Sequence, residues 1–307
     1  MSKAQKKIYK YATGKIDYKL TNDCMFQAVM RANKKVLKGF LCSLLHLHSN
    51  EVKTITILNP FELSEMVRDK IFILDIKILL NNAMVINIEL QVRGQEFWND
   101  RSLSYLCRTF DNLKKGESYS DVRPAYHIGI LNFTPFPEHP EFYASNKKMN
   151  VKKHYIYNDK FTLNVLDLNQ IKLATDEDKK WKLDLWARLF KAKTWEDLKM
   201  LAQEDKIFND AGETIFKFNQ DEKVRYWCEA FEEQERFELS IKQSYKKFLA
   251  EKDAIIAEKE SAIAERDFAL AEKDSALAEK DSALAQQKEE NQRLLAEIQK
   301  LKEAYKE

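Results

Sequence analysis

Residues 71–92 carry the most regular alternation of apolar and polar positions in the chain. The large apolar side chains at every second position are Phe72, Leu74, Ile76, Ile78, Leu80, Met84, Ile86, Ile88, Leu90 and Val92. Alternation of this kind over two runs predicts a β-hairpin with one apolar face. If the turn is centred on Asn82, Asp75 lies directly opposite Glu89, and both point away from the apolar face together with Gln91.

Two opposed carboxylates destabilise a sheet unless something compensates their charge. Cross-strand Cβ atoms lie about 5 Å apart, where two like charges repel by roughly 3 kcal/mol at an effective dielectric constant near 20. A divalent cation would convert that repulsion into ligation, because Mg²⁺ prefers carboxylate oxygens. The alternative is a solvated sheet face that tolerates two acids. A one-residue slip in register would instead move one acid to the core side.

The remaining pattern up to residue 175 predicts helices alternating with short strands. Apolar positions at helical spacing predict helices over 21–31, 34–47 and 96–114, and β-branched or continuous apolar runs predict strands over 52–58, 125–133, 153–158 and 161–168. This order indicates a mixed α/β core with flanking helices. We therefore expect a first domain over residues 1–175.

From residue 176 onward the pattern is helical throughout. Residues 176–240 predict a small helical subdomain, with Trp181, Leu185, Trp186 and Leu189 on one stripe. Residues 241–307 form a tail of tandem heptads that begin at Ile256, Ile263, Leu270, Leu277 and Leu284. A seven-residue apolar repeat predicts a coiled coil and, with Asn291 at a seam position, a homodimer. A single solvated helix is the alternative.

Charge divides unevenly along the chain. Residues 1–175 hold 26 Lys and Arg against 17 Asp and Glu, whereas the remaining residues hold 25 against 32. A basic first half is typical of a domain that binds a polyanion such as DNA. The N-terminal lysines Lys3, Lys6, Lys7, Lys10 and Lys15, interleaved with tyrosines, are candidates for contacts with phosphates. A frayed, solvated terminus is the alternative.

The cysteines and the lengths of the apolar runs indicate the cellular compartment of the protein. The four cysteines are scattered without metal-ligand spacing, which predicts reduced thiols in a cytoplasmic protein. No apolar run approaches eighteen residues, so we expect no membrane span.

The hairpin and its neighbours resemble a known family. Asp75, then a gap, then Glu89-Leu90-Gln91 is similar to the PD-(D/E)XK metal-dependent nuclease superfamily, which places an Asp on one strand and E-x-K on the next. The ordered segments TNDCMFQAVM, LNPFE, LDIK, NIELQV, FWNDRSLSYLCRTFDNLKKGESY and AYHIGILNF resemble, over about residues 20–135, its branch of recombination-promoting nucleases and transposases. The resemblance implies a restriction-endonuclease-like fold.

The resemblance also implies a chemistry. Asp75, Glu89 and the backbone carbonyl of Leu90 would hold Mg²⁺ or Mn²⁺ in a DNA endonuclease linked to recombination, transposition or phage defence. Gln91 stands where the superfamily has Lys, so it can orient a water molecule but brings no charge. A catalytically inactive DNA-binding or scaffolding protein, assembled through the coiled coil, is the alternative.

Four further residues are candidates for supporting roles. Asp23 matches an acidic position that recurs in the first helix of the family, and it could also be a helix cap. Arg101 and Tyr105 lie four apart on one helix face, where Arg101 could contact a phosphate or could be an ordinary surface residue. Lys77 lies on the polar face of the hairpin and could supply a cation.

Overall fold

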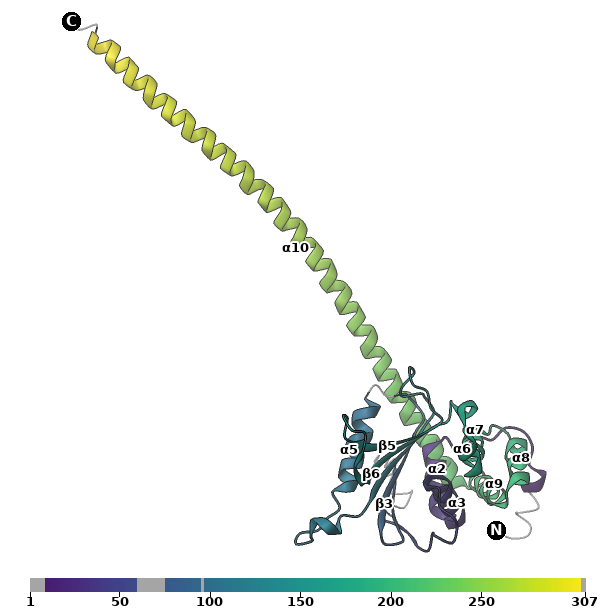
Figure 1. Ribbon diagram of the computed structural model, residues 1–307. Coiled ribbons are helices and arrows are strands. Elements are labelled where there is room, and N and C mark those ends of the chain that lie inside the picture. Colours follow the sequence, from purple (N-terminus) through teal and green to yellow (C-terminus); the bar gives the residue numbers. More distant parts are fainter. Residues whose placement is uncertain (1–8, 60–74, 95–96, 305–307) are drawn as a thin grey trace. The chain divides into compact units, whose positions relative to one another are not determined.

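The computed structural model describes residues 9–59, 75–94 and 97–304, and the chain divides into two compact units, Met1–Glu235 and Arg236–Glu307. The first unit is built around a six-stranded sheet with the order β1-β2-β3-β4-β6-β5 (Figure 1). The strands are β1 (Ile55–Ile57), β2 (Asp75–Leu80), β3 (Met84–Gln91), β4 (Ala125–Leu131), β5 (Tyr143–Met149) and β6 (Ile156–Asp167). β3, β4 and β6 are parallel and the other pairs are antiparallel, so the predicted mixed sheet is confirmed.

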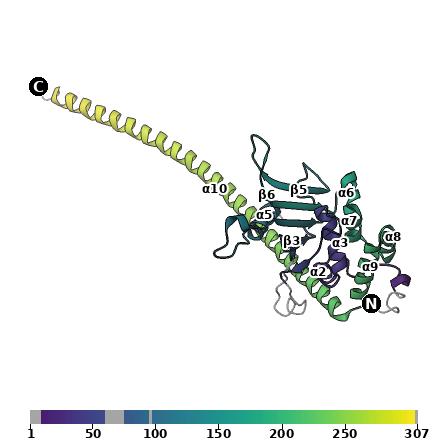
Figure 2. The same ribbon diagram turned by 60° about the horizontal axis from the view of Figure 1, so that its bottom comes forward.

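Helices cover both faces of this sheet. The described helices are α2 (Asp23–Ala32), α3 (Lys34–Leu45), α5 (Trp98–Phe110), α6 (Asp176–Lys180), α7 (Leu183–Lys191), α8 (Trp195–Glu204), α9 (Lys206–Asn219) and α10 (Glu222–Ala304), with 3-10 turns η1 (Tyr119–Asp121) and η2 (Ile171–Leu173). α5 packs on β3, β4 and β6, while α2 and α3 lie on the other side of the sheet (Figures 1 and 2). α7 and α9 pack on α2 and α3 and so extend the same core.

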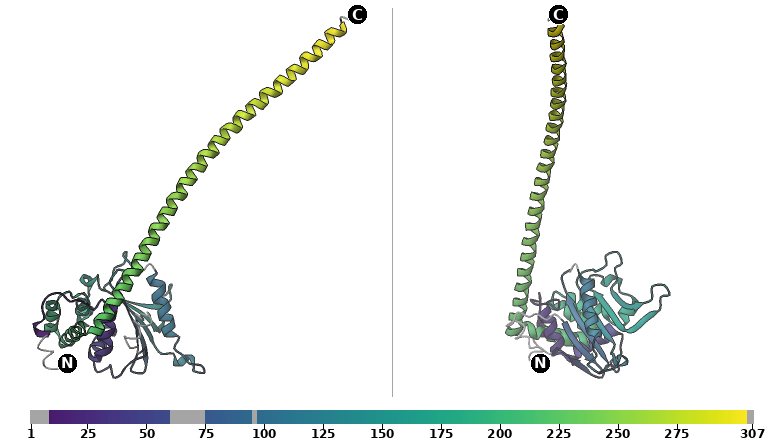
Figure 3. Two further views of the ribbon diagram at one scale, coloured as in Figure 1. Left: turned by 180° about the vertical axis from the view of Figure 1, so that it is seen from behind. Right: turned by 90° about the vertical axis from the view of Figure 1, so that its left-hand side faces the viewer.

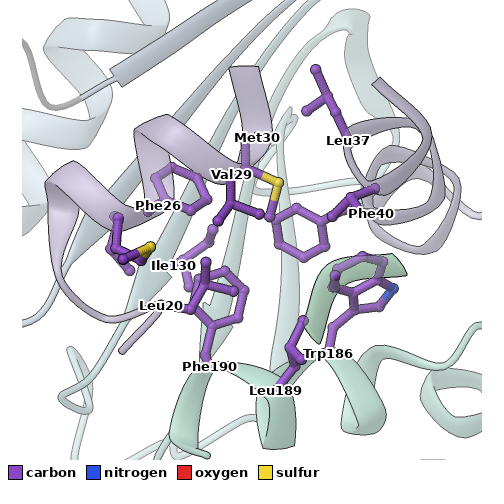
Figure 4. Packing of buried hydrophobic residues seen from close by; sticks show 14 of the residues in the cluster. Leu20, Phe26, Val29, Met30, Leu37, Phe40, Ile130, Trp186, Leu189 and Phe190 are labelled. Carbon is purple, nitrogen blue, oxygen red and sulfur yellow. The ribbon is translucent and has the colours of Figure 1, made fainter. Parts of the chain in front are cut away.

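The main core fills the space between the apolar face of the sheet and these helices. Its centre combines aromatic and aliphatic side chains from several elements, including Leu20, Phe26, Val29, Met30, Leu37, Phe40, Ile130, Trp186, Leu189 and Phe190 (Figure 4). The rings of Phe40 and Trp186 have centroids 4.8 Å apart, and the Trp186 indole N–H donates to Ser43 Oγ at 2.9 Å. That hydrogen bond satisfies the one polar atom of a fully buried Trp.

Asparagine side chains determine where α2 and α3 begin, and two further asparagines form the turn of the β2–β3 hairpin. Asn22 caps α2 by accepting from the backbone N–H of Met25, and Asn33 caps α3 in the same way. Asn81 and Asn82 adopt positive φ angles of 53° and 55° between β2 and β3. Asn tolerates the left-handed region better than most residues, so these two positions can form the tight turn that sets the hairpin register.

Two sequence predictions about the end of the sheet are wrong. Residues 153–158 and 161–168 are not two strands, because Ile156–Asp167 is a single strand, β6. β5, which has the polar sequence YASNKKM, was not predicted at all. It lies at the edge of the sheet and pairs only with β6, so its sequence needs no buried face and shows no apolar alternation.

The second unit consists of the continuation of α10, which is one unbroken helix (Figure 3). Its apolar heptad residues are exposed in the single chain, among them Ile256, Ile263, Leu270, Leu277, Leu284, Leu294, Ile298 and Leu301. In the described part of the chain, no helix has the length and apolar character needed to cross a membrane.

Candidate active site

The two acids of the hairpin face each other across neighbouring strands. Asp75 on β2 pairs with Glu89 on β3, which confirms the predicted register. The alternative of a solvated face is wrong, because α5 covers this side of the sheet and Glu89 is only 1% exposed. Asp75, at the first residue of β2, remains partly exposed. The pair therefore combines one buried carboxylate with one that solvent can reach.

Arg101 of α5 reaches down onto the buried acid. Its Nε donates to Oε1 of Glu89 at 2.8 Å, and its Nη2 lies 3.4 Å from the hydroxyl of Tyr105 one turn later. The guanidinium carbon is 5.1 Å from the centre of the Tyr105 ring, within cation–π range. Arg101 is therefore not an ordinary surface residue, because it pairs with Glu89 while part of its side chain stays exposed. The predicted contact of Arg101 with a phosphate stays a prediction.

The second oxygen of Glu89 faces a histidine that sequence reasoning missed. His127 on β4 is fully buried, and its Nε2 lies 3.6 Å from Glu89 Oε2. Its Nδ1 lies 3.2 Å from the amide nitrogen of Asn87, which can only donate, so the ring proton belongs on Nε2. Burial lowers the pKa of His127 to about 4, with Arg101 acting in the same direction, so the ring is neutral at pH 7. The available signal was a histidine in the middle of the largely apolar run AYHIGILNF.

Gly129 leaves space for the ring of Trp98, which packs beside His127. Gly129 on β4 lies beside Glu89 in the sheet, and a Cβ at this position would lie 2.4 Å from the ring of Trp98. The absence of a side chain lets Trp98, the first residue of α5, pack directly on the strand. Its ring lies 6.1 Å from that of His127 and closes one side of the site.

Asp23 comes to the site from the start of α2. Asn22 is the cap, so the capping role considered for Asp23 falls to its neighbour, and Asp23 is buried with Oδ1 lacking a hydrogen-bond partner. Burial raises its pKa well above the ordinary value, and the charges of Glu235 and Glu89 raise it further. Asp23 therefore lies close enough to Glu89 for the charge of Glu89 to act on its pKa, and its supporting role stays a prediction.

Arg31 ties α2 to the other acid. Its Nε donates to Gln27 Oε1 at 2.7 Å, and its Nη2 lies 3.4 Å from the backbone carbonyl of Asp75. Burial raises the pKa of Asp75, while the positive charges of Arg31 and Lys77 partly oppose that shift. Lys77 thus lies close enough for its charge to act on Asp75. Neither Gln27 nor Arg31 was predicted, because both fall within an ordinary helical stretch.

Gln91 and the backbone of Leu90 complete this end of β3. The Gln91 amide nitrogen donates to the Arg93 carbonyl at 3.3 Å, and its Oε1 is buried without a partner. The Gln91 carbonyl accepts from the N–H of Asn132 on the β4 side. Carbonyls alternate in direction along a strand, so the Leu90 carbonyl points toward β2, the strand of Asp75.

Of the predicted N-terminal lysines, the two that the structure describes, Lys10 and Lys15, are not brought to this site. Lys3, Lys6 and Lys7 lie outside the described residues. Lys15 pairs with Thr194 through the backbone, and Lys10 lies beside Lys199 of α8. α8 lies on the side of the first unit away from α5 (Figures 1 and 2).

The oxygen atoms gathered here are those that a hard divalent cation prefers. Glu89 Oε2, Gln91 Oε1 and Asp23 Oδ1 are buried and lack hydrogen-bond partners, which is costly unless something else satisfies them. Within residues 9–59, 75–94 and 97–304, no three His, Cys, Asp or Glu side chains are arranged to hold a metal ion. An ion on Asp75 and Glu89 would therefore need amide, carbonyl, water or phosphate oxygens as well, as is usual for Mg²⁺.

The structure combines a mixed sheet with an acid pair on adjacent strands and a polar residue two positions after the second acid, which is the arrangement expected from the resemblance to metal-dependent nucleases. The chain belongs to the PD-(D/E)XK nuclease family transposases, because the sequence model of that family matches residues 20–244, more than half of its length. No curated protein and no solved structure matched the chain. Membership in this family indicates a nuclease or transposition role that depends on DNA and is typically metal-dependent.

Proposed function

We propose that the protein is a metal-dependent DNA endonuclease that hydrolyses phosphodiester bonds. The observation that carries this proposal is the opposed pair Asp75 and Glu89, surrounded by buried oxygens that no hydrogen bond satisfies. Asp75, Glu89 and the Leu90 carbonyl would hold Mg²⁺ or Mn²⁺. When bound, such an ion neutralises phosphate charge and lowers the pKa of a coordinated water.

The surrounding residues would position the reacting groups. Gln91, whose amide nitrogen is held by the Arg93 carbonyl, presents its unpartnered Oε1 as an acceptor for the attacking water. Arg101 is half-exposed and pairs with Glu89 through Nε, which leaves part of its guanidinium for a phosphate oxygen. Lys77 adds positive charge near Asp75. These two cations would supply the charge that Gln91 lacks in comparison with the family lysine.

Incubation of the purified protein with supercoiled plasmid DNA tests this function directly. We expect nicking and then linearisation in 5–10 mM Mg²⁺ or Mn²⁺ (roughly the range in which weakly held Mg²⁺ sites fill) and none in excess EDTA. Restoring the metal after EDTA treatment should restore cleavage. Cleavage that persists unchanged in EDTA, or its absence with both metals while DNA is bound, would contradict the endonuclease proposal.

The second candidate is a DNA-binding or scaffolding protein without catalytic activity. Gln91 in place of lysine and the ion pair of Arg101 with Glu89 favour it, because both reduce the charge available to the reaction. The plasmid assay distinguishes the two candidates, since a DNA-binding protein without catalytic activity would slow the migration of the plasmid in a gel without cutting it. In either case family membership supports a nuclease or transposition role. We propose that this role is linked to recombination, transposition or phage defence.

We further propose that the heptad tail forms a homodimer that brings two such sites to one duplex. Its apolar seam positions are exposed in the single chain, and a partner helix would bury them. In the repeats the other seam position is Lys or Arg, at Lys259, Arg266, Lys273 and Lys280, which must bend outward to stay solvated. Most apolar burial therefore falls in the last three heptads, from Leu284 onward.

Truncation after Gln286 is expected to convert the dimer largely to monomer at micromolar concentration. The truncated chain loses Leu294, Ile298 and Leu301 together with Asn291. The matched control deletes residues 264–277, two whole heptads, which keeps the seven-residue phase and should leave the dimer intact. Light scattering on both variants measures the outcome, and a dimeric truncation would place self-association in the first unit instead.

A further inference from the structure

We propose that the β5–β6 hairpin, residues 143–160, is a DNA-binding element. It would bind phosphates of the duplex at a distance from the acid pair Asp75 and Glu89. The proposal rests on the proposed function, because it names the surface through which that site would hold its substrate. It assigns the polyanion-binding character of residues 1–175 to a folded part of the sheet, in addition to the N-terminal lysines.

The hairpin concentrates positive charge on an exposed surface. It contains five lysines, Lys147, Lys148, Lys152, Lys153 and Lys160, against the single acid Asp159. The first four are exposed, and none of them forms a salt bridge to an acid within the part of the chain that the structure describes. Clustered lysines without acidic partners repel one another, so a polyanion that binds across them gains affinity by releasing its counterions.

The tip of the hairpin is ordered by its own hydrogen bonds. Asn150 Oδ1 accepts from the backbone N–H groups of Lys152 and Lys153, at 3.0 and 2.9 Å. The Asn150 carbonyl accepts from the N–H of His154, whose φ of 53° turns the chain back toward β6. The backbone that carries Lys152 and Lys153 is therefore preorganised, which lowers the entropy lost when a partner binds.

Aromatic side chains lie among these cations instead of in the core. Tyr155 and Tyr157 are 53% and 67% exposed, and the Lys148 ammonium lies 4.8 Å from the centre of the Tyr157 ring. Tyr hydroxyls and lysines are among the groups that contact phosphate and sugar in protein–DNA complexes. An apolar protein partner would leave the four lysine charges uncompensated, whereas a duplex offers a negative charge at each phosphate.

The strand register places this element within reach of the same duplex. Glu89 on β3 is level with Gly129 on β4, which is level with Val165 on β6. Ile156, where β6 leaves the hairpin turn, is nine positions before Val165 and so lies about 30 Å away along the strand at about 3.3 Å per residue, with the tip lysines a few residues beyond it. Two helical turns of B-DNA extend about 68 Å, so one duplex is long enough to contact both the acid pair and the hairpin.

Fluorescence anisotropy with a labelled 25-base-pair duplex (roughly two and a half turns of B-DNA) in EDTA tests the element without cleavage. The variant Lys152→Gln/Lys153→Gln should bind about tenfold more weakly, and its slope of log Kd against log salt should fall by about two, since each lost phosphate contact contributes about 0.9. The matched control Lys206→Gln/Lys223→Gln removes the same charge from two exposed lysines of α9 and α10 and should bind within about twofold of wild type. Circular dichroism verifies that both variants fold.

Equal loss in the two double variants, no loss in either, or no duplex binding by the wild type at low salt would overturn the proposal. So would unchanged duplex binding together with loss of binding to vesicles of anionic phospholipid, because the hairpin would then serve a membrane surface. The two proposals can fail separately. If the wild type cleaves DNA with metal but the hairpin lysines are dispensable for binding, only the proposal of the hairpin as a binding element is contradicted. If binding depends on the hairpin but the wild type does not cleave, only the endonuclease proposal is contradicted.

Discussion

Replacement of Glu89 by Gln is expected to lower metal-dependent DNA cleavage by at least about a thousandfold, and Asp75→Asn should have a comparable effect. Each change keeps the shape of the side chain but removes one of the two negative charges that would hold the cation. Glu89 is buried, so no other acid can reach its place. Single-turnover cleavage of a linear duplex at saturating protein measures the chemical step apart from DNA affinity.

A matched control separates this loss from a general effect of charge. Asp100→Asn removes an exposed acid from the first turn of α5 and should cleave like the wild type. Metal-free thermal stability should stay level or rise in Asp75→Asn and Glu89→Gln, because burial raises the pKa of both acids and makes their charge unfavourable. Unchanged cleavage by both folded variants would contradict the site, and a large loss of metal-free stability would make the pair structural.

Replacement of Arg101 by Met should cost the metal-free protein about 3 kcal/mol of unfolding free energy at pH 8, because it leaves Glu89 charged, buried and unpaired. Burial is the main cause that lowers the pKa of neighbouring His127, and it persists without Arg101, so we expect His127 to stay neutral at pH 8 and not to replace the positive charge. Urea denaturation in EDTA measures the loss. The exposed pair Lys179–Asp176 gives the matched control, because Lys179→Met removes an i,i+3 pair at 3.5 Å and should cost less than about 1 kcal/mol.

The deficit of Arg101→Met should depend on pH in a defined direction. Burial raises the pKa of Glu89 above its ordinary value, and loss of Arg101 removes the opposing influence. The folded state then binds a proton more readily than the unfolded chain, so stability falls as pH rises through the folded pKa. The deficit should shrink from pH 8 toward about pH 5 and nearly vanish in the double variant Arg101→Met/Glu89→Gln. A deficit independent of pH would mean that packing, not charge, explains the loss.

The sheet was predictable where its strands have one apolar face and a defined turn. The hairpin register followed from alternation and Asn82, and it placed Asp75 opposite Glu89 without further information. β5 was not predictable, because an edge strand without a buried face leaves no periodic signal. The boundary assigned near residue 160 was wrong because polar residues within a long strand resemble a turn when burial is unknown.

The site was predictable to the extent that it is local in sequence. Asp75, Glu89 and Gln91 belong to one hairpin, and Arg101 follows on the next helix. His127 was missed because it reaches Glu89 through the parallel pairing of β3 with β4, a contact that no local spacing encodes. The ion pair of Arg101 with Glu89 was not predictable either. The sequence indicates which residues share one face of a helix, but not the element against which that face packs.

The first and last parts of the globular unit are joined directly. The Tyr18 N–H donates to Asn219 Oδ1 at 2.9 Å, and the side-chain amide of Asn22, the residue that caps the helix of Asp23, donates to the Cys228 carbonyl at 3.3 Å. These bonds link residues about two hundred positions apart. During synthesis on the ribosome, α2 therefore lacks its final partners until nearly all of the unit has emerged. The acid of the first helix is thus fixed late, and a nascent chain shorter than about residue 228 carries the acid pair without a completed site.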